Sequence, residues 1–128
     1  MMKKLTANLM VDNVNSTVEF YKIHLGFELV MTVPDSGQFD WAMMKSGNVE
    51  IMFQAMTSIG NDLPGMKGQK VGGTLLLYID VEDVKKFRSS LKNDVSIVKD
   101  VQKTFYGTEE FTIRDINGYY LTFAGGGQ

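Results

Sequence analysis

The sequence predicts an α+β fold made of two tandem βαβββ modules. Residues 37–53 (GQFDWAMMKSGNVEIMF) and 107–123 (GTEEFTIRDINGYYLTF) each hold two alternating apolar runs around a Gly-Asn or Asn-Gly dipeptide. This pattern is typical of a β-hairpin. A constant offset of 70 residues separates the two stretches and sets Trp41 against Phe111. Because the segment before each hairpin predicts the same strand–helix–strand order, the sequence indicates an internal duplication.

The first module begins with apolar alternation over residues 5–11, which predicts a strand. Asn15 or Ser16 is expected to cap a helix with one apolar face, and Gly26 is expected to end it. Residues 27–33 then predict a second strand, which leads into the first hairpin.

The second module repeats this order. Residues 74–79 predict a strand, and a helix follows whose apolar face carries Val84, Phe87 and Leu91. Residues 95–101 predict the strand before the second hairpin.

A stretch rich in glycine, residues 55–73, predicts one long loop between the modules. We therefore expect a single domain over residues 1–128, with modules at 1–55 and 73–124 and a linker at 56–72.

Composition limits the classes of function. The net charge of −2 and the pI of about 5.3 leave no basic field for nucleic acid. The chain has no cysteine, which excludes disulfides and thiolate metal sites. The apolar run after the basic start of the chain is too short for a signal peptide or a membrane span. These features predict a cytoplasmic protein that acts without a membrane.

Two segments are distinctive together: residues 8–29 (NLMVDNVNSTVEFYKIHLGFEL) and residues 106–123 (YGTEEFTIRDINGYYLTF). They make the chain resemble the vicinal-oxygen-chelate superfamily, which includes glyoxalase I, bleomycin-resistance proteins, fosfomycin-resistance enzymes and extradiol dioxygenases. The resemblance implies that each module curls its strands into a half-barrel cup, open for a small ligand. It also implies that the protein forms a homodimer.

Members of this superfamily that use a metal place His or Glu on the first, fourth, fifth and eighth strands. By this resemblance the four positions fall on Thr6, Met52, Thr74 and Thr122, and shifts of one residue reach only Glu50. Hydroxyl and thioether groups are poor ligands for zinc, nickel or iron(II). We therefore expect no metal and no cofactor, and metal-dependent lyase or dioxygenase activity is disfavoured.

Strand alternation, with a two-residue turn in each hairpin, predicts which side chains line the cup. A loop of odd length or a bulge would reverse the assignment. The predicted ligand-binding residues are Thr6, Asn8, Trp41, Met43, Met52, Gln54, Thr74, Tyr78, Phe111, Ile113, Tyr120 and Thr122. They predict an apolar, aromatic cup with hydroxyl groups, which suits a flat organic ligand. The alternative is a cup that its own side chains fill.

Glu110 is a candidate general base if it faces the cup, and otherwise forms a charge pair with Arg114. Three functions stay open: a metal-free binding protein of the bleomycin-resistance type that sequesters an apolar or aromatic molecule, a glyoxalase-like lyase or isomerase with an atypical site, and a fold used for protein contacts. The Thr and Met at the metal positions favour the first over the second. The aromatic Trp41 and Phe111 favour it over the third.

Overall fold

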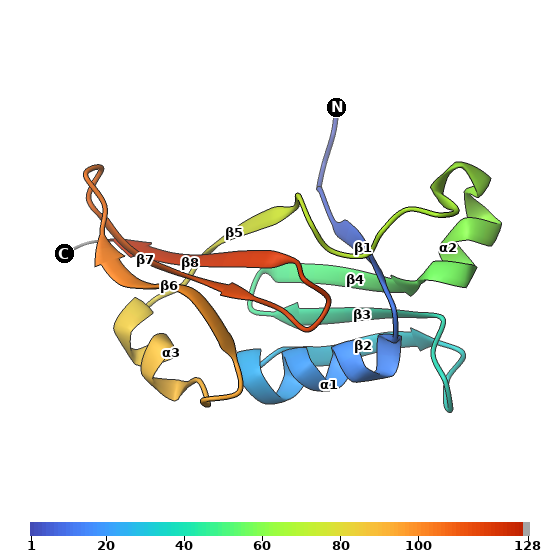
Figure 1. The fold of residues 1–128 in the computed structure, drawn as a ribbon, viewed down its shortest axis with the longest axis horizontal. Coiled ribbons are helices and arrows are strands. Elements are labelled where there is room, and N and C mark those ends of the chain that lie inside the picture. Colours follow the sequence, from blue (N-terminus) through green and yellow to red (C-terminus); the bar gives the residue numbers. More distant parts are fainter. Residues whose placement is uncertain (127–128) are drawn as a thin grey trace. The chain divides into compact units, whose positions relative to one another are not determined.

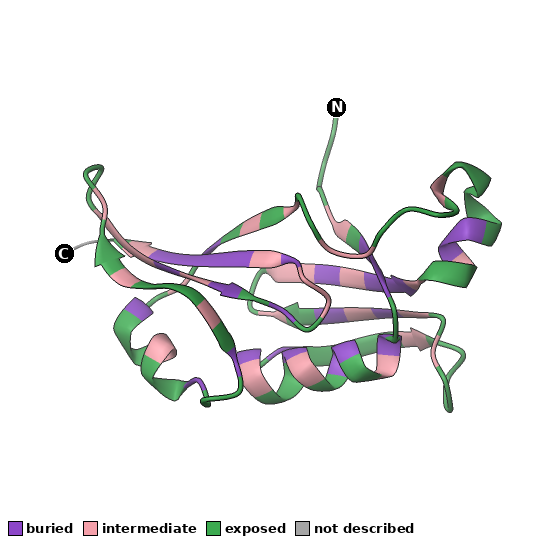
Figure 2. Ribbon diagram, in the orientation of Figure 1, coloured by how far each residue is buried: buried purple, intermediate pink, exposed green. Residues whose placement is uncertain are grey.

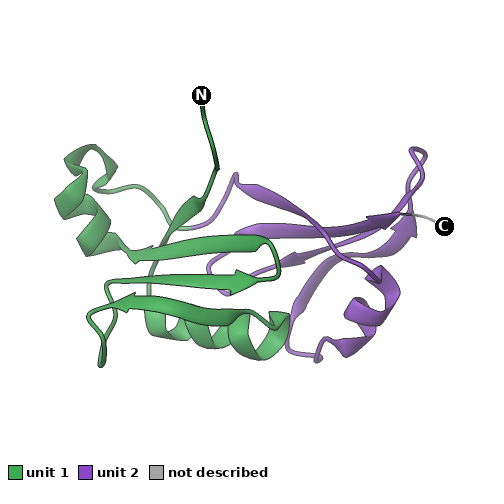
Figure 3. Cartoon of the chain, turned by 180° about the vertical axis from the view of Figure 1, so that it is seen from behind, with its two compact units in different colours: residues 1–71 green, residues 72–128 purple. Residues whose placement is uncertain are grey.

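The computed structural model describes residues 1–126 and divides the chain into two compact units, Met1–Val71 and Gly72–Gln128 (Figure 3). Each unit contains one four-stranded sheet, and each begins with the order strand, helix, strand, strand, strand (Figure 1). The predicted α+β fold of two tandem βαβββ modules is therefore confirmed.

Unit 1 holds one mixed sheet with the strand order β1-β4-β3-β2, in which β1 runs parallel to β4. Its elements are β1 (Ala7–Val11), α1 (Val14–Leu25), β2 (Glu28–Val33), β3 (Trp41–Ser46), β4 (Val49–Ala55), α2 (Met56–Asp62) and the 3₁₀ turn η1 (Pro64–Met66).

The N-cap of helix α1 lies two residues before the first of the predicted caps. The side chain of Asn13 accepts a hydrogen bond of 2.8 Å from the Ser16 amide and is the N-cap. Asn15 instead accepts from the Phe39 amide and donates to the Gly37 carbonyl, at 2.8 and 2.9 Å, and so holds the loop before β3. The expectation that Asn15 or Ser16 caps this helix was wrong, because Asn13 already satisfies a free amide at the helix start.

The core of unit 1 lies between α1 and one face of the sheet. Tyr21 of α1 packs on Phe53 of β4, with ring centroids 4.7 Å apart, and on Phe27 at 5.5 Å. All three residues are buried. Figure 2 shows buried positions recurring along the helix and the sheet of this unit. Aromatic pairs at these distances add to the stabilisation that burial of their area provides.

The segment predicted as a long loop is partly helical. Residues 56–62 form α2, and η1 follows at once, both before the end of unit 1 (Figure 1). Helix α2 has no side-chain N-cap and contains Gly60, so its sequence favours a helix only weakly. Contacts with the sheet, described below, hold it in place.

Unit 2 repeats the sheet order as β5-β8-β7-β6, with β5 parallel to β8. Its elements are β5 (Leu76–Asp80), α3 (Val84–Ser90), β6 (Ser96–Lys103), β7 (Thr108–Arg114) and β8 (Tyr120–Gly126). None of the helices within residues 1–126 is long and apolar enough to cross a membrane.

The core of unit 2 is a cluster of three phenylalanine rings. Phe87 of α3 lies 4.8 Å from Phe123 of β8 and 5.9 Å from Phe111 of β7, measured between ring centroids. Phe111 and Phe123 are 98–99% buried, so they form the sheet face that packs on α3.

Candidate functional site

The first candidate site is the sheet face of unit 1 that points away from α1. In the β3–β4 hairpin, Trp41 lies opposite Gln54 and Met43 opposite Met52, and on β1 Asn8 lies beside Met52. These five side chains share a face, because paired residues on neighbouring strands point the same way. The predicted pairing of the first hairpin, which puts Trp41, Met43, Met52 and Gln54 on one face, is thus confirmed.

A two-residue turn sets this register. Ser46 pairs with Val49, and Gly47 between them has a φ of +57°. Glycine at the first central position is typical of the type II′ turns that join tight hairpins.

The exposure of the strands separates the two faces of this sheet. Ala42, Met44 and Phe53 point toward α1 and are fully buried. Trp41 and Met43, on the opposite face, stay partly exposed, as does Met52. Large apolar side chains that remain accessible on one face are suited to contact an apolar ligand.

A chain of hydrogen bonds joins this face to α2. The Gln54 amide oxygen accepts a bond of 2.9 Å from Asn8, and its nitrogen donates to Ser58 at 2.9 Å and to Asp62 at 2.8 Å. Gln54 is 92% buried, so these bonds fix its amide in place. Sequence reasoning named Gln54 as a ligand-binding residue but missed its partners on α2, because the segment was expected to be a loop.

The face assignment of the second hairpin was wrong. Phe111 lies opposite Phe123, and Ile113 opposite Leu121, so all four point toward α3 and are buried. They do not share a face with Tyr120 and Thr122. Phe111 and Ile113 therefore lie in the core of unit 2.

The physical reason is the length of the second turn. Asp115 and Tyr119 close it through a backbone hydrogen bond of 2.8 Å, and three residues, 116–118, form the loop. Gly118, with a φ of +89°, occupies the left-handed position that three-residue hairpin loops require. The Asn117-Gly118 dipeptide thus belongs to a loop of odd length, which reverses the side chains of β7 relative to the prediction.

The structural match between the units identifies the correct equivalents. Met52 on β4 and Thr122 on β8 keep the spacing of 70, with Asn8 and Tyr78 beside them on the parallel strands. On β7 the spacing is 69, because Glu110 lies opposite Ala124 as Trp41 lies opposite Gln54. Glu110, and not Phe111, is therefore the counterpart of Trp41.

The face of unit 2 that points away from α3 is more polar. Thr112 and Thr122 lie opposite each other, and their hydroxyl oxygens are 2.8 Å apart. Next to them, the guanidinium of Arg114 lies over the Tyr120 ring, 5.6 Å from its centroid, a cation–π distance. Tyr78 on β5 is 54% exposed beside Thr122.

Glu110 is the centre of a hydrogen-bonded cluster on this face. Its Oε2 atom accepts from the hydroxyl groups of Tyr78, Tyr106 and Thr108, the last two at 3.0 Å. No ion pair joins Glu110 to Arg114 in the part of the chain that the structure describes. The predicted Glu110–Arg114 charge pair is therefore wrong.

The cluster shifts the pKa values of its members. Burial alone would raise the pKa of Glu110, but hydrogen bonds from Tyr78, Thr108 and Tyr106 outweigh it and leave the pKa below its usual value. The hydrogen bond to Glu110 raises the pKa of Tyr78 to about 12 and also raises the pKa of Tyr106. A carboxylate with a lowered pKa is a weak base, so the arrangement does not suit Glu110 for proton abstraction.

Two predicted site residues lie outside the strands. Thr6 precedes β1 and is partly exposed, and Thr74 lies in a bend before β5 and is exposed. Neither is hydrogen-bonded within a strand pair, so the structure brings Asn8 and Tyr78, rather than Thr6 and Thr74, next to Met52 and Thr122.

Comparison with known proteins identifies the family. The chain matches the Glyoxalase/Bleomycin resistance protein/Dioxygenase superfamily over residues 5–123 and belongs to it. No curated protein matches the chain.

Solved structures share the fold at low sequence identity. TioX from Micromonospora sp. ML1 is 17% identical with a TM-score of 0.79, and the match covers 98% of this chain and 99% of that one. A protein of unknown function from Agrobacterium tumefaciens str. C58 is 18% identical with a TM-score of 0.80, covering 98% and 94%. A glyoxalase/bleomycin resistance protein/dioxygenase family enzyme from Burkholderia phytofirmans PsJN is 16% identical with a TM-score of 0.77, covering 94% and 95%. At these identities the likeness concerns the fold alone.

The residues at the superfamily's metal positions do not fit a divalent ion. Residues 1–126 contain no group of three His, Cys, Asp or Glu side chains placed to hold a metal. Glu50, the carboxylate that a shift of one residue would reach, accepts a hydrogen bond from Lys4, which lowers the Glu50 pKa. Thr and Met supply only weak donors to zinc or iron(II).

Proposed function

We propose that this protein is a small-molecule binding protein that holds a planar, largely apolar organic molecule without a metal. The binding surface is the face of the unit 1 sheet that carries Trp41, Met43 and Met52. The observation that carries the proposal is the partial exposure of these three large apolar side chains on one face. In this reading the protein sequesters its ligand, as expected for the bleomycin-resistance branch of the superfamily.

The chemistry of this face favours an aromatic ligand. The Trp41 ring can stack on a flat molecule, which contributes about 0.5–1.5 kcal/mol beyond burial. Thioether sulfurs of Met43 and Met52 make favourable contacts with aromatic rings and adapt to irregular shapes. Asn8, which is exposed beside Met52, offers a polar group at the edge of the apolar surface.

Catalysis of the glyoxalase type is the weaker candidate. It requires a Lewis acid or an acid–base pair that titrates near neutral pH. The hydrogen bonds of the Glu110 cluster move the pKa values of Glu110 and Tyr78 in opposite directions, both away from neutrality. The cluster is therefore better explained as a fixed polar surface than as an acid–base pair.

We propose that the protein binds its ligand in the cytoplasm and that it does so as a homodimer. The absence of cysteine from the sequence fits a reducing compartment. An exposed apolar edge strand, discussed below, supports self-association.

The test uses Trp41, the only tryptophan of the chain, as a reporter. Proflavine, a planar cation, and anthracene-9-methanol, a planar neutral compound, are titrated while Trp41 emission and heat of binding are recorded. We expect saturable changes in emission for at least one of the two. We also expect Met43→Gln to weaken its binding about threefold or more, since the loss of apolar contact area costs about 25 cal/mol per Å².

The matched control is Ile23→Gln, which makes the same kind of change at an exposed position on α1. Binding that is weakened equally by both substitutions, or an absence of saturable binding for both compounds, would contradict a ligand on the Trp41 face.

A further inference from the structure

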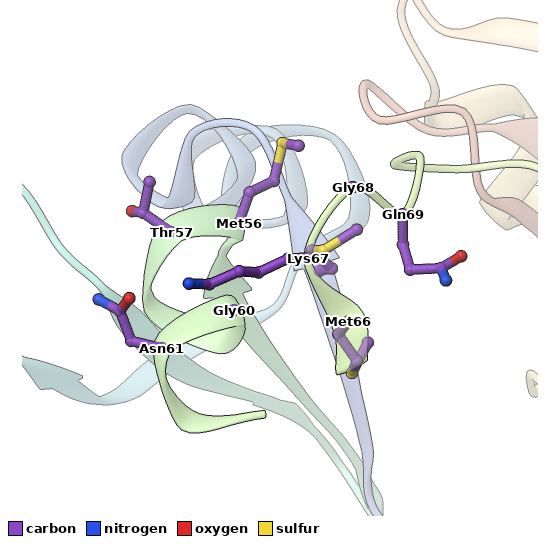
Figure 4. Close-up of a pocket in the computed structure, with 9 residues that line it drawn as sticks. Met56, Thr57, Gly60, Asn61, Met66, Lys67, Gly68 and Gln69 are labelled. Carbon is purple, nitrogen blue, oxygen red and sulfur yellow. The ribbon is translucent and has the colours of Figure 1, made fainter. Parts of the chain in front are cut away.

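A pocket of about 290 Å³ lies in unit 1 between α2, η1 and the end of β1 (Figure 4). It is lined by Met10, Met56, Thr57, Gly60, Asn61, Met66, Lys67, Gly68 and Gln69. This volume lies just below the usual range of small-molecule sites, which is about 300–1,000 Å³. The pocket thus has room for a molecule of one or two rings.

The walls of the pocket are mostly apolar and are built from methionine. Met56 comes from α2, Met66 from η1 and Met10 from β1. In Figure 4 the sulfur atoms of Met56 and Met66 point away from each other, so the two thioethers do not converge on a common metal position. Methionine walls of this kind suit an organic body, and an aromatic ring in particular.

One cation crosses the pocket. The side chain of Lys67 extends over Gly60 toward Thr57 and Asn61 (Figure 4). The lysine stem passes close to the helix here, since a Cβ atom at position 60 would lie 3.0 Å from Lys67 Cγ. Lys67 therefore lines the pocket together with two polar side chains, Thr57 and Asn61.

The charge of Lys67 is not neutralised within the described chain. No carboxylate of residues 1–126 forms an ion pair with Lys67. The acidic residue of α2, Asp62, accepts a hydrogen bond from Gln54 at 2.8 Å and is held against the sheet. An anionic ligand in the pocket would therefore meet an exposed, unpaired ammonium group beside an apolar wall. It could accept a charge-assisted hydrogen bond, which is stronger than a bond between neutral groups.

We propose that this pocket binds a small aromatic carboxylate, with its ring between Met10, Met56 and Met66 and its carboxylate on the Lys67 ammonium. The pocket borders the Trp41 face, because Met10 lies beside Gln54 on the same side of the sheet. Its other walls come from α2 and η1, and the proposal does not depend on the function proposed for that face. Asn61 and Thr57 supply further donors for the carboxylate oxygens.

The probe is 2-naphthoate, compared with its uncharged analogue 2-naphthylmethanol. Protein labelled with ¹³C in its methionine methyl groups reports separately on Met10, Met56 and Met66 in the pocket and on Met43 and Met52 on the Trp41 face. We expect 2-naphthoate to shift the three pocket methyl signals saturably. The uncharged analogue should bind about tenfold more weakly, because it lacks the charge-assisted hydrogen bond.

Substitutions at two lysines separate this contact from general attraction. Lys67→Met removes the charge but keeps an unbranched apolar chain, and it should weaken 2-naphthoate binding about tenfold. Lys67→Arg keeps the charge and should retain most of the affinity. Lys70→Met, at an exposed lysine that does not line the pocket, should change the affinity less than twofold.

Several results would overturn the assignment. These are equal binding of the acid and the alcohol, an equal loss with Lys70→Met and Lys67→Met, and shifts confined to Met43 and Met52. The last result would place the ligand on the Trp41 face and so support that function while rejecting this pocket. Thermal melting of each variant shows whether a lost affinity reflects unfolding.

Discussion

Among single residues, Glu110 has the clearest effect on how the stability of the protein depends on pH. Its carboxylate accepts hydrogen bonds from two tyrosines, so it stabilises their neutral forms. The raised pKa of Tyr78 makes this contribution to stability complete below the ordinary value of 10.0, and it is lost as the pH rises through about 12. The lowered pKa of Glu110 makes its own contribution complete above the ordinary value of 4.5, and it is lost as the pH falls through the folded-state pKa. The cluster is therefore intact throughout the neutral range.

We predict that Tyr78 titrates near pH 12 in the native protein and closer to 10.0 in the variant Glu110→Gln, because the amide carries no charge. Nuclear magnetic resonance of ¹³C-labelled tyrosine, followed against pH, measures both values. The control is Glu109→Gln on the same strand, since Glu109 points to the opposite face, where it pairs with Lys85 at 3.4 Å. A native Tyr78 that titrates at its ordinary pH would refute the hydrogen bond as described.

At the scale of secondary-structure elements, Asp115 determines the form of the β7–β8 turn. It is 95% buried, and its Oδ1 atom accepts from the amides of Asn117 and Tyr119, both at 2.9 Å. Side chains of aspartate commonly stabilise turns in this way. The three-residue loop is thus held by two bonds that the Gly47-Asn48 turn does not need.

We predict that Asp115→Ala lowers the free energy of unfolding by about 1–3 kcal/mol per unsatisfied buried group, because two amides lose their acceptor. Asp115→Asn should lose less, since its amide oxygen can accept the same bonds. Urea denaturation of both variants measures the difference. Equal losses for alanine and asparagine would mean that the charge, and not the acceptor, matters at this position.

The two hairpins also illustrate what a sequence can predict about strands. The register of the first followed from Gly47-Asn48, because a two-residue turn leaves one possible pairing. The same rule applied to Asn117-Gly118 was wrong, because Asp115 extends the loop by one residue. Alternation predicted the strands themselves correctly, but their faces depend on loop length, which a side chain outside the dipeptide determines.

Helix α2 was missed for a related reason. Its sequence, MTSIGND, lacks a cap and contains glycine, so local propensity indicates a loop. Tertiary contacts hold the helix in place. Ile59 is 96% buried, and Gln54 of β4 donates hydrogen bonds to Ser58 and Asp62. Such contacts lie outside any short sequence window.

At the scale of the whole molecule, β2 is a free edge of the unit 1 sheet. It pairs only with β3, and Leu29, Val30, Met31 and Val33 are 41–57% exposed. Natural proteins usually protect such an edge with charges, a bulge or a covering segment. The pairing of β2 with β3 has one irregularity, between Leu29 and Met31. Residues 29–33 carry no charge, and we infer that this apolar edge strand favours pairing with a second chain.

We predict a homodimer, with a mass near twice the 14.3 kDa of one chain in sedimentation at micromolar concentration. Met31→Lys should shift it toward the monomer, because a charge on an edge strand opposes pairing. Ile116→Lys, at an equally exposed apolar position in the β7–β8 loop, serves as the control. A native monomer at this concentration, or equal dissociation by both substitutions, would contradict an interface along β2.

The extra residue in the β7–β8 loop has a consequence for the history of the gene. The helix caps Asn13 and Asp83 keep the spacing of 70, as do Met52 and Thr122, whereas Trp41 and Glu110 are spaced by 69. If the halves arose from one ancestral segment, one extra codon in this loop accounts for the return of the spacing from 69 to 70. One fewer codon between the helix cap and β7 accounts for the earlier change from 70 to 69. An alignment of the two halves therefore needs a gap in each place, and a gapless alignment pairs a buried phenylalanine with an accessible tryptophan. In the corrected alignment, Trp41 of the first half is matched by Glu110 of the second half. The two halves thus keep the same fold, while an aromatic surface in one half corresponds to a hydrogen-bonded carboxylate in the other.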